Sequence, residues 1–192
     1  MRSFAFALLA AGSALVAAPA IAQTGTGPFS GARVEGTVGW DRVQNNGHND
    51  DVTYGVGAGY DWNSNGTVFG IDGEISDSNV KQCSGARTAA DPRFCAKVAR
   101  DLYVGGRIGK QVGDRALVYA KAGYTNARAK LTADDGSDEV TLDKVDLDGV
   151  RVGAGAEYAV GPNSFVKAEY RYSNYEQGFT RHQVLGGFGF RF

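Results

Sequence analysis

Hydrophobic and polar residues alternate with a period of two along most of the chain, which is typical of strands with two unlike faces. In one segment Val150, Val152 and Ala154 alternate with Arg151 and Gly153. The same pattern predicts eight strands, over residues 33–41, 52–62, 69–76, 101–109, 118–125, 150–158, 166–173 and 183–192.

The connections between these strands alternate strictly between short and long. The short ones, at 63–66, 112–115 and 161–163, contain residues suited to tight turns. The long polar ones lie at 44–51, 77–98, 128–147 and 174–180. Short periplasmic turns and longer external loops are typical of membrane barrels. The sequence therefore predicts an all-β protein, an eight-stranded antiparallel up-and-down transmembrane β-barrel.

Composition decides which face of each strand points inward. A soluble barrel or β-sandwich would bury the apolar face, yet that face is rich in alanine and would pack a thin core. The 28 glycines mostly share the other face with charged residues. A narrow lumen suits glycine beside paired charges, so we expect the polar face inside, where unpaired charges would be costly. The predicted lumen charges are Arg33, Glu35, Asp72, Glu74, Arg107, Lys121, Arg151, Glu157, Lys167, Glu169 and Arg171.

Aromatic residues gather at both ends of the predicted strands, as expected where rings meet lipid headgroups. Ordinary strand propensity also favours these residues. The set near the turns is Trp62, Phe69, Tyr158, Phe190 and Phe192, and the set near the loops is Trp40, Tyr54, Tyr172 and Tyr175.

The N-terminus has the three regions of a secretory signal peptide. Arg2 precedes an apolar run that is too short to span a membrane, and small residues stand before Gln23. We expect residues 1–22 to be the signal peptide, residues 23–31 a short periplasmic segment and residues 32–192 the barrel. Cleavage leaves 19 basic and 21 acidic side chains, a balance that gives no reason to expect nucleic acid as a partner.

Cys83 and Cys95 lie in one long connection of an exported chain, so a disulfide between them is expected. Two free thiols or a metal site are the alternatives, although no histidine is nearby in the sequence. The connection at 128–147 and the residues beside it are acidic and could hold a divalent cation, but a solvated loop explains them equally.

The closing residues 184–192, with alternating Phe188, Phe190 and Phe192, resemble the C-terminal signal of outer-membrane β-barrels. Residues 103–109 and 118–124 also resemble strands of the porin-like, OmpA-like and opacity-type small barrels. The resemblance implies location in the cell outer membrane, contact with its lipid and lipopolysaccharide, and handling by periplasmic chaperones and the barrel assembly machinery. It is specific for architecture and implies no particular activity.

The chain offers few residues for catalysis. His48 lies near two aspartates and His182 lies beside Arg181, which raises the idea of an acid–base pair, but loop histidines explain both. We expect no enzymatic activity, no cofactor and no metal. The leading hypothesis is a surface protein with a role in envelope structure and in adhesion to a host or surface ligand through its loops. A small porin-like channel and a lipid-modifying or proteolytic enzyme are the alternatives.

Overall fold

The computed structural model describes residues 29–44, 48–78, 81–86, 93–134 and 139–192. Nearly all of these residues are in strands. The predicted signal peptide lies outside the described residues, as does the predicted periplasmic segment apart from its last three residues. The elements are β1 (Gly31–Gln44), β2 (His48–Ser64), β3 (Thr67–Ser78), β4 (Lys81–Ser84), β5 (Arg93–Val112), β6 (Ala116–Asp134), β7 (Glu139–Ala159), β8 (Ser164–Tyr175), the short 3-10 helix η1 (Glu176–Gly178) and β9 (Thr180–Arg191).

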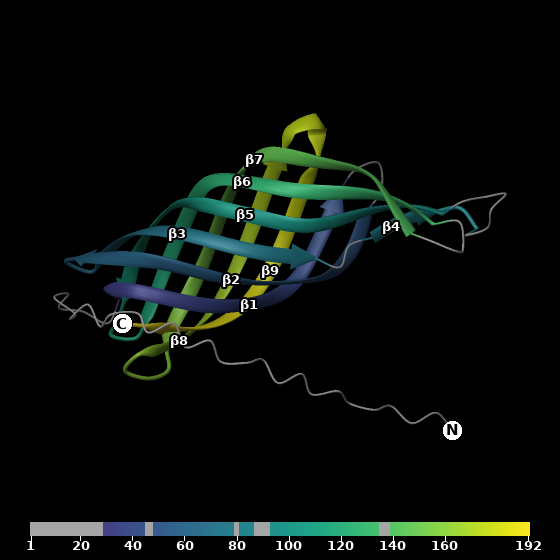
Figure 1. The fold of residues 1–192 in the computed structure, drawn as a ribbon. Coiled ribbons are helices and arrows are strands. Elements are labelled where there is room, and N and C mark those ends of the chain that lie inside the picture. Colours follow the sequence, from purple (N-terminus) through teal and green to yellow (C-terminus); the bar gives the residue numbers. More distant parts are fainter. Residues whose placement is uncertain (1–28, 45–47, 79–80, 87–92, 135–138) are drawn as a thin grey trace, which may run out of the picture.

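Eight of the nine described strands close into an antiparallel barrel. The sheet runs in the order β3-β2-β1-β9-β8-β7-β6-β5-β4, and a further pairing of β3 with β5 closes the ring (Figure 1). The short β4 lies outside the ring and pairs with the first residues of β5. Within the ring each strand pairs with the ring strand that follows it in the sequence, and β9 pairs with β1. The predicted eight-stranded up-and-down barrel is therefore confirmed.

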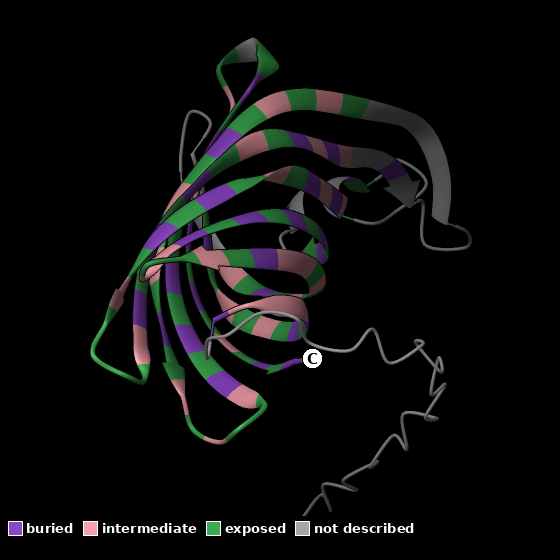
Figure 2. Cartoon of the chain, turned by 90° about the vertical axis from the view of Figure 1, so that its left-hand side faces the viewer, coloured by how far each residue is buried: buried purple, intermediate pink, exposed green. Residues whose placement is uncertain are grey.

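Burial alternates residue by residue along each strand, as the banding in Figure 2 shows. In β3, Glu74 is 8% exposed whereas the next residue, Ile75, is 55% exposed. The charged residues point into the lumen and the branched aliphatic residues point outward. This is the reverse of a soluble barrel, and it is the arrangement that a hydrocarbon solvent requires. No helix within the described ranges is long and apolar enough to span a membrane.

The turn between β2 and β3 shows why the short connections were recognisable. Ser64 pairs directly with Thr67, which leaves a turn of two residues. Asn65 and Gly66 both have positive φ, at 52° and 77°. A type I′ turn requires positive φ at both central positions, and Asn-Gly is the preferred sequence for it because these residues tolerate that conformation.

The long connections contain more strand than the sequence predicts. β1 extends to Gln44, and β2 begins at His48. β5 begins at Arg93, β6 continues to Asp134, and β7 begins at Glu139. Outside the hydrocarbon layer a strand needs no apolar face, since ladder hydrogen bonds still satisfy its backbone. Alternation of hydrophobicity therefore disappears although the strand continues.

Most of the predicted aromatic residues face outward at the two ends of the barrel. Trp62 and Phe69 are 51% and 47% exposed near the short turns, and Trp40 and Tyr54 are 55% and 48% exposed near the long connections. Tyr175 differs, because it is buried in the lumen and its hydroxyl donates a hydrogen bond to Asp101. Its assignment to an aromatic band was wrong, since its position on β8 has inward parity.

Candidate functional site

Glycine makes room in the narrow lumen for long charged side chains. A Cβ added at Gly59 would lie 2.8 Å from Nη2 of Arg33, and one at Gly70 would lie 2.2 Å from Oδ1 of Asp61. Tyr103 fills the space over Gly105 in the same way. Because interiors pack without voids, side chains from opposite walls meet across these glycines. The result is three layers of ion pairs stacked along the barrel.

The lower layer, nearest the short turns, centres on Asp61. Its Oδ1 accepts a hydrogen bond of 2.8 Å from Nε of Arg107, and its Oδ2 lies 3.0 Å from Nη2 of Arg191. Arg191 also lies 2.9 Å from Glu157, which pairs with Arg107. The members are Arg33, Asp61, Asp72, Arg107, Glu157 and Arg191.

The middle layer has two lysines between three carboxylates. Nζ of Lys167 lies 2.6 Å from Glu35 and 3.0 Å from Glu169, and Nζ of Lys121 lies 2.9 Å from Glu169. Arg33 reaches up to Glu35 at 3.0 Å and joins this layer to the lower one. The members are Glu35, Glu74, Lys121, Lys167, Glu169 and Arg171.

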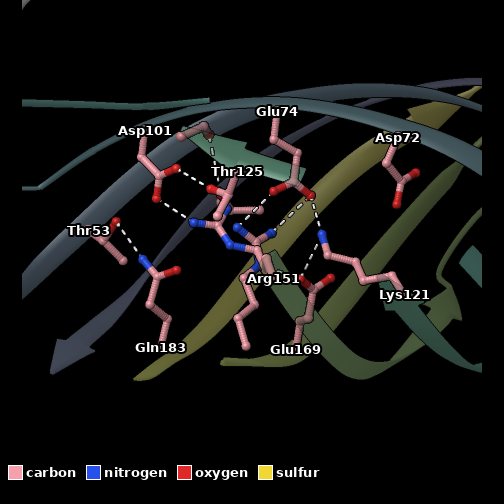
Figure 3. Close-up of polar contacts among 12 residues, drawn as sticks. Thr53, Asp72, Glu74, Asp101, Lys121, Thr125, Arg151, Glu169 and Gln183 are labelled. Carbon is pink, nitrogen blue, oxygen red and sulfur yellow. Dashed lines mark hydrogen bonds and ion pairs between the residues drawn. The ribbon is translucent and has the colours of Figure 1, made fainter. Parts of the chain in front are cut away.

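The upper layer lies toward the long connections and is shown in part in Figure 3. Nη1 of Arg181 lies 2.6 Å from Asp101, which also pairs with Arg151. Arg181 holds Asp41 through its Nε at 2.8 Å. Thr125 donates a further hydrogen bond of 2.7 Å to Asp101. The four charges of this layer are therefore bound to one another and to neutral hydroxyls.

Each layer contains equal numbers of opposite charges. The lower layer has three carboxylates and three cations, and so does the middle layer. The upper layer has two carboxylates and two cations. The described part of the lumen is thus neutral at every level and filled by side chains. Breaking one buried pair leaves an uncompensated charge, which typically costs about 3–5 kcal/mol. The network can hold the barrel wall rigid, and it leaves little space for an aqueous path.

An apolar cluster closes the lumen below the lower layer. Phe29, Val68 and Leu117 are fully buried together. The guanidinium of Arg191 lies 5.4 Å from the ring centre of Phe29 and 4.9 Å from that of Phe165, so its cation stacks on both rings. Phe29 precedes the first strand, so the chain before the barrel contributes to its core.

All eleven predicted lumen charges are buried in the structure. The prediction missed five partners, which complete the lower and upper layers: Asp41, Asp61, Asp101, Arg181 and Arg191. Four of these follow the inward parity of their strands and could have been found from alternation alone. Arg181 was considered only as a neighbour of His182 at the loop end, because the start of β9 lacks apolar alternation.

The two histidines lie on different strands, His48 on β2 and His182 on β9. His182 faces outward, where its Nδ1 lies 2.7 Å from the hydroxyl of Tyr170 and its ring packs 5.0 Å from that of Tyr172. Arg181 points into the lumen instead. His48 begins β2 opposite Gln44.

The predicted cysteine pair lies on a short hairpin outside the barrel. Cys83 of β4 is the direct ladder partner of Cys95 of β5. Cys95 is disulfide-bonded. This placement supports a Cys83–Cys95 disulfide, which remains a prediction of the sequence.

The acidic connection is described only in part, since residues 135–138 lie outside the described ranges. Asp146 accepts hydrogen bonds of 2.7 and 2.9 Å from Arg128, which hold the pKa of its carboxyl below the usual range. Asp148 accepts one of 2.7 Å from Asn126. Within the described ranges no group of three or more potential ligands could hold a metal ion.

A closed barrel with an apolar exterior and a charged, filled interior defines a small membrane β-barrel protein. The chain belongs to the outer membrane protein beta-barrel domain family, whose model matches residues 4–192. It is a small outer-membrane β-barrel protein.

Two relatives with similar sequences are named as outer-membrane proteins. The chain is 32% identical to the 31 kDa outer-membrane immunogenic protein of Brucella melitensis over 126 residues, which are 62% of this chain and 52% of that protein. The match thus spans about half of that relative. Identity to the 22 kDa outer membrane protein of Rhizobium leguminosarum is 30% over 159 residues, or 74% of this chain and 69% of that protein.

Two solved structures share the fold at low sequence identity. Ail, the attachment invasion locus protein of Yersinia pestis, is 17% identical with a TM-score of 0.58, and the match covers 85% of this chain and 99% of that one. Its structure was solved in complex with the heparin analogue sucrose octasulfate. Neisserial surface protein A is 18% identical with a TM-score of 0.58, covering 85% and 98% of the two chains.

Proposed function

We propose that this protein is a non-enzymatic surface barrel that contributes to envelope structure and recognises partners through its extracellular connections. The filled, neutral lumen carries this proposal. Eight strands leave room for side chains and little else, and here three layers of ion pairs occupy that room. A porin-like channel would need these layers to be broken. We therefore place the protein's contacts with partners on the outside of the barrel.

The strands β5, β6 and β7 supply such an outside surface. The ladder between β7 and β8 ends at the pair Gly149 and Tyr175. The ladder between β6 and β7 continues beyond that level to the pair Asp134 and Glu139. Figure 1 shows this extension projecting from one end of the barrel together with β4. The Brucella relatives are named as immunogenic proteins, which is consistent with surface exposure.

The connection at 77–98 suggests the chemistry of a partner. It contains the cations Lys81, Arg87, Arg93 and Lys97 against Asp77 and Asp91. The complex of Ail with a heparin analogue is a precedent, on this fold, for binding a sulfated sugar. Clustered cations bind such polyanions through charge-assisted hydrogen bonds. We infer that a sulfated polysaccharide is the class of ligand that this connection recognises. The connection at 128–147 is less suited to such a ligand, because it has an acidic excess.

Retention on a heparin-coated surface tests this function. The full protein in detergent micelles should be retained at low salt and released as salt rises, since the contact is electrostatic. The double variant Arg93→Gln/Lys97→Gln should be retained much less, whereas Arg128→Gln on the other connection should behave like the wild type. Absence of wild-type retention, or equal loss in both variants, would contradict the proposed ligand class.

Export through a cleaved signal peptide is also a proposal. N-terminal sequencing of the protein purified from outer membranes should begin at Gln23. An N-terminus that retains residues 1–22 would contradict it.

A further inference from the structure

The lipid-facing surface carries a groove of about 1210 Å³ that crosses six neighbouring strands. At the usual strand spacing of roughly 4.8 Å, six strands give it a length of about 24 Å. It climbs from the periplasmic end of β9 to the level at which β6 becomes polar. One row of ladder partners forms its centre: Phe190, Val34, Ala58, Gly73, Val104 and Tyr124.

The floor of this groove is made of small residues that the barrel itself does not require. A Cβ added at Gly36 would meet nothing within 4 Å, and one at Gly73 would meet only a carbonyl oxygen at 4.0 Å. Lumen glycines such as Gly105 differ, since a Cβ there would clash at 2.2 Å. Glycine inside a strand costs about 0.5–1 kcal/mol relative to alanine. The space over Gly36 and Gly73 lets an external body approach the backbone of the groove closely.

A second groove of about 320 Å³ continues the first toward the extracellular end. It shares Val56 and Ile75 with the large groove and ends at Tyr54, Asp77 and Arg100. Nε of Arg100 is buried and has no hydrogen-bond partner among the described residues. The apolar groove thus ends at a guanidinium.

The carboxylates around Arg100 have donors of their own. Arg128 holds Asp146 through two hydrogen bonds, and Asn126 and Tyr124 hold Asp148. Asp77, which faces Arg100 across the ladder, accepts a bond from the amide of Ser78. Arg100 also interacts electrostatically with Asp146. Among the described residues no carboxylate forms an ion pair with Arg100, so its guanidinium can bind a phosphate oxygen at the end of the groove.

We propose that this groove retains one lipid A molecule of lipopolysaccharide, with an acyl chain over Gly36 and Gly73 and a phosphate at Arg100. The cation lies at the extracellular end, so the phosphate must come from a lipid of the outer leaflet. An inner-leaflet phospholipid would direct its phosphate to the opposite end, where the groove is lined by Phe188 and Phe190. The site is independent of the recognition proposed for the extracellular connections.

Native mass spectrometry of the refolded full protein with added lipid A tests this site. One lipid A should remain bound to the wild type. Gly73→Leu should weaken binding at least about tenfold, because the new side chain occupies the space of the acyl chain. Gly106→Leu is the matched control. Gly106 also faces lipid on the neighbouring strand, and a Cβ there would meet its nearest atom at 3.6 Å, but it does not line the groove.

A second comparison tests the phosphate contact. Arg100→Gln should weaken binding of lipid A but not of dephosphorylated lipid A. Each variant is first checked for a heat-dependent gel shift, and Gly36→Leu replaces Gly73→Leu if the latter does not fold. The proposal would be overturned if Gly106→Leu weakened binding as much as Gly73→Leu, or if Arg100→Gln affected both lipids equally. It would also be overturned if phosphatidylethanolamine were retained equally well, or if the protein formed a dimer without lipid.

Discussion

Asp61 is the common partner of several cations in the lower layer of the lumen. Three arginines, Arg33, Arg107 and Arg191, contact this single carboxylate from three different strands. Neutralising it would leave their positive charges without their common partner in a medium that cannot solvate them. The same carboxylate lies beside Gly70, so its position also depends on the absence of a side chain there.

Asp61→Asn should therefore destabilise the folded barrel by about 3–5 kcal/mol, as expected when a buried pair loses one member. The measurement is the free energy of unfolding in urea from lipid vesicles. The control is Asp146→Asn, which removes a carboxylate from an exposed pair and should change stability little. Equal stability of Asp61→Asn and wild type would show that the lower layer contributes nothing.

The two kinds of glycine predict opposite results for alanine substitution. Gly105→Ala should destabilise the barrel, because its Cβ would clash with the hydroxyl of Tyr103 and with the backbone carbonyl oxygen of Ala122 on β6. Gly36→Ala should be neutral or stabilising by up to about 1 kcal/mol, since alanine is favoured where space allows. The same unfolding experiment checks both. A similar loss in the two variants would contradict the distinction.

At the scale of elements, alternation located every barrel strand but not the strand extensions. Residues 118–125 were recognisable because lipid selects apolar residues at every second position of β6. The continuation to Asp134 was hidden, since a polar strand in water obeys no such rule. Tyr175 was misplaced for another reason: its assignment used only its height along β8, whereas its parity with Arg171 and Ser173 places it inside.

The β4–β5 hairpin should depend on its disulfide while the barrel does not. In the simple chain-entropy model, closing this loop contributes roughly 3 kcal/mol. Reduction, or the variant Cys83→Ser/Cys95→Ser, should expose residues 84–94 to protease, as followed by mass spectrometry of the fragments. The heat-dependent gel shift of the barrel should persist. Loss of that shift on reduction would contradict the independence of the hairpin.

The Arg128–Asp146 pair gives the extension a pH dependence. Hydrogen bonds from Arg128 lower the pKa of Asp146, so its stabilising effect is present above the unfolded pKa and is lost as pH falls through the folded value. A carbon NMR titration should give a lower pKa for Asp146 in wild type than in Arg128→Gln. Equal values would show that the pair does not form in solution.

At the scale of the whole molecule, the lumen decides what this barrel can do. The sequence predicted the eight strands, the inward face and eleven buried charges, since all follow from the period of two. It could not predict which charges pair, because the pairs join residues up to 140 positions apart in the chain. Nor could it predict that each layer is neutral, which requires the register between strands.

The central claim is that balanced ion pairs close the lumen, and conductance in planar lipid bilayers tests it most directly. Protein that has first shown a heat-dependent gel shift should insert without discrete conductance steps, because three layers of side chains and the cluster around Phe29 block the path. Reproducible single-channel steps from the folded wild-type protein would contradict the account.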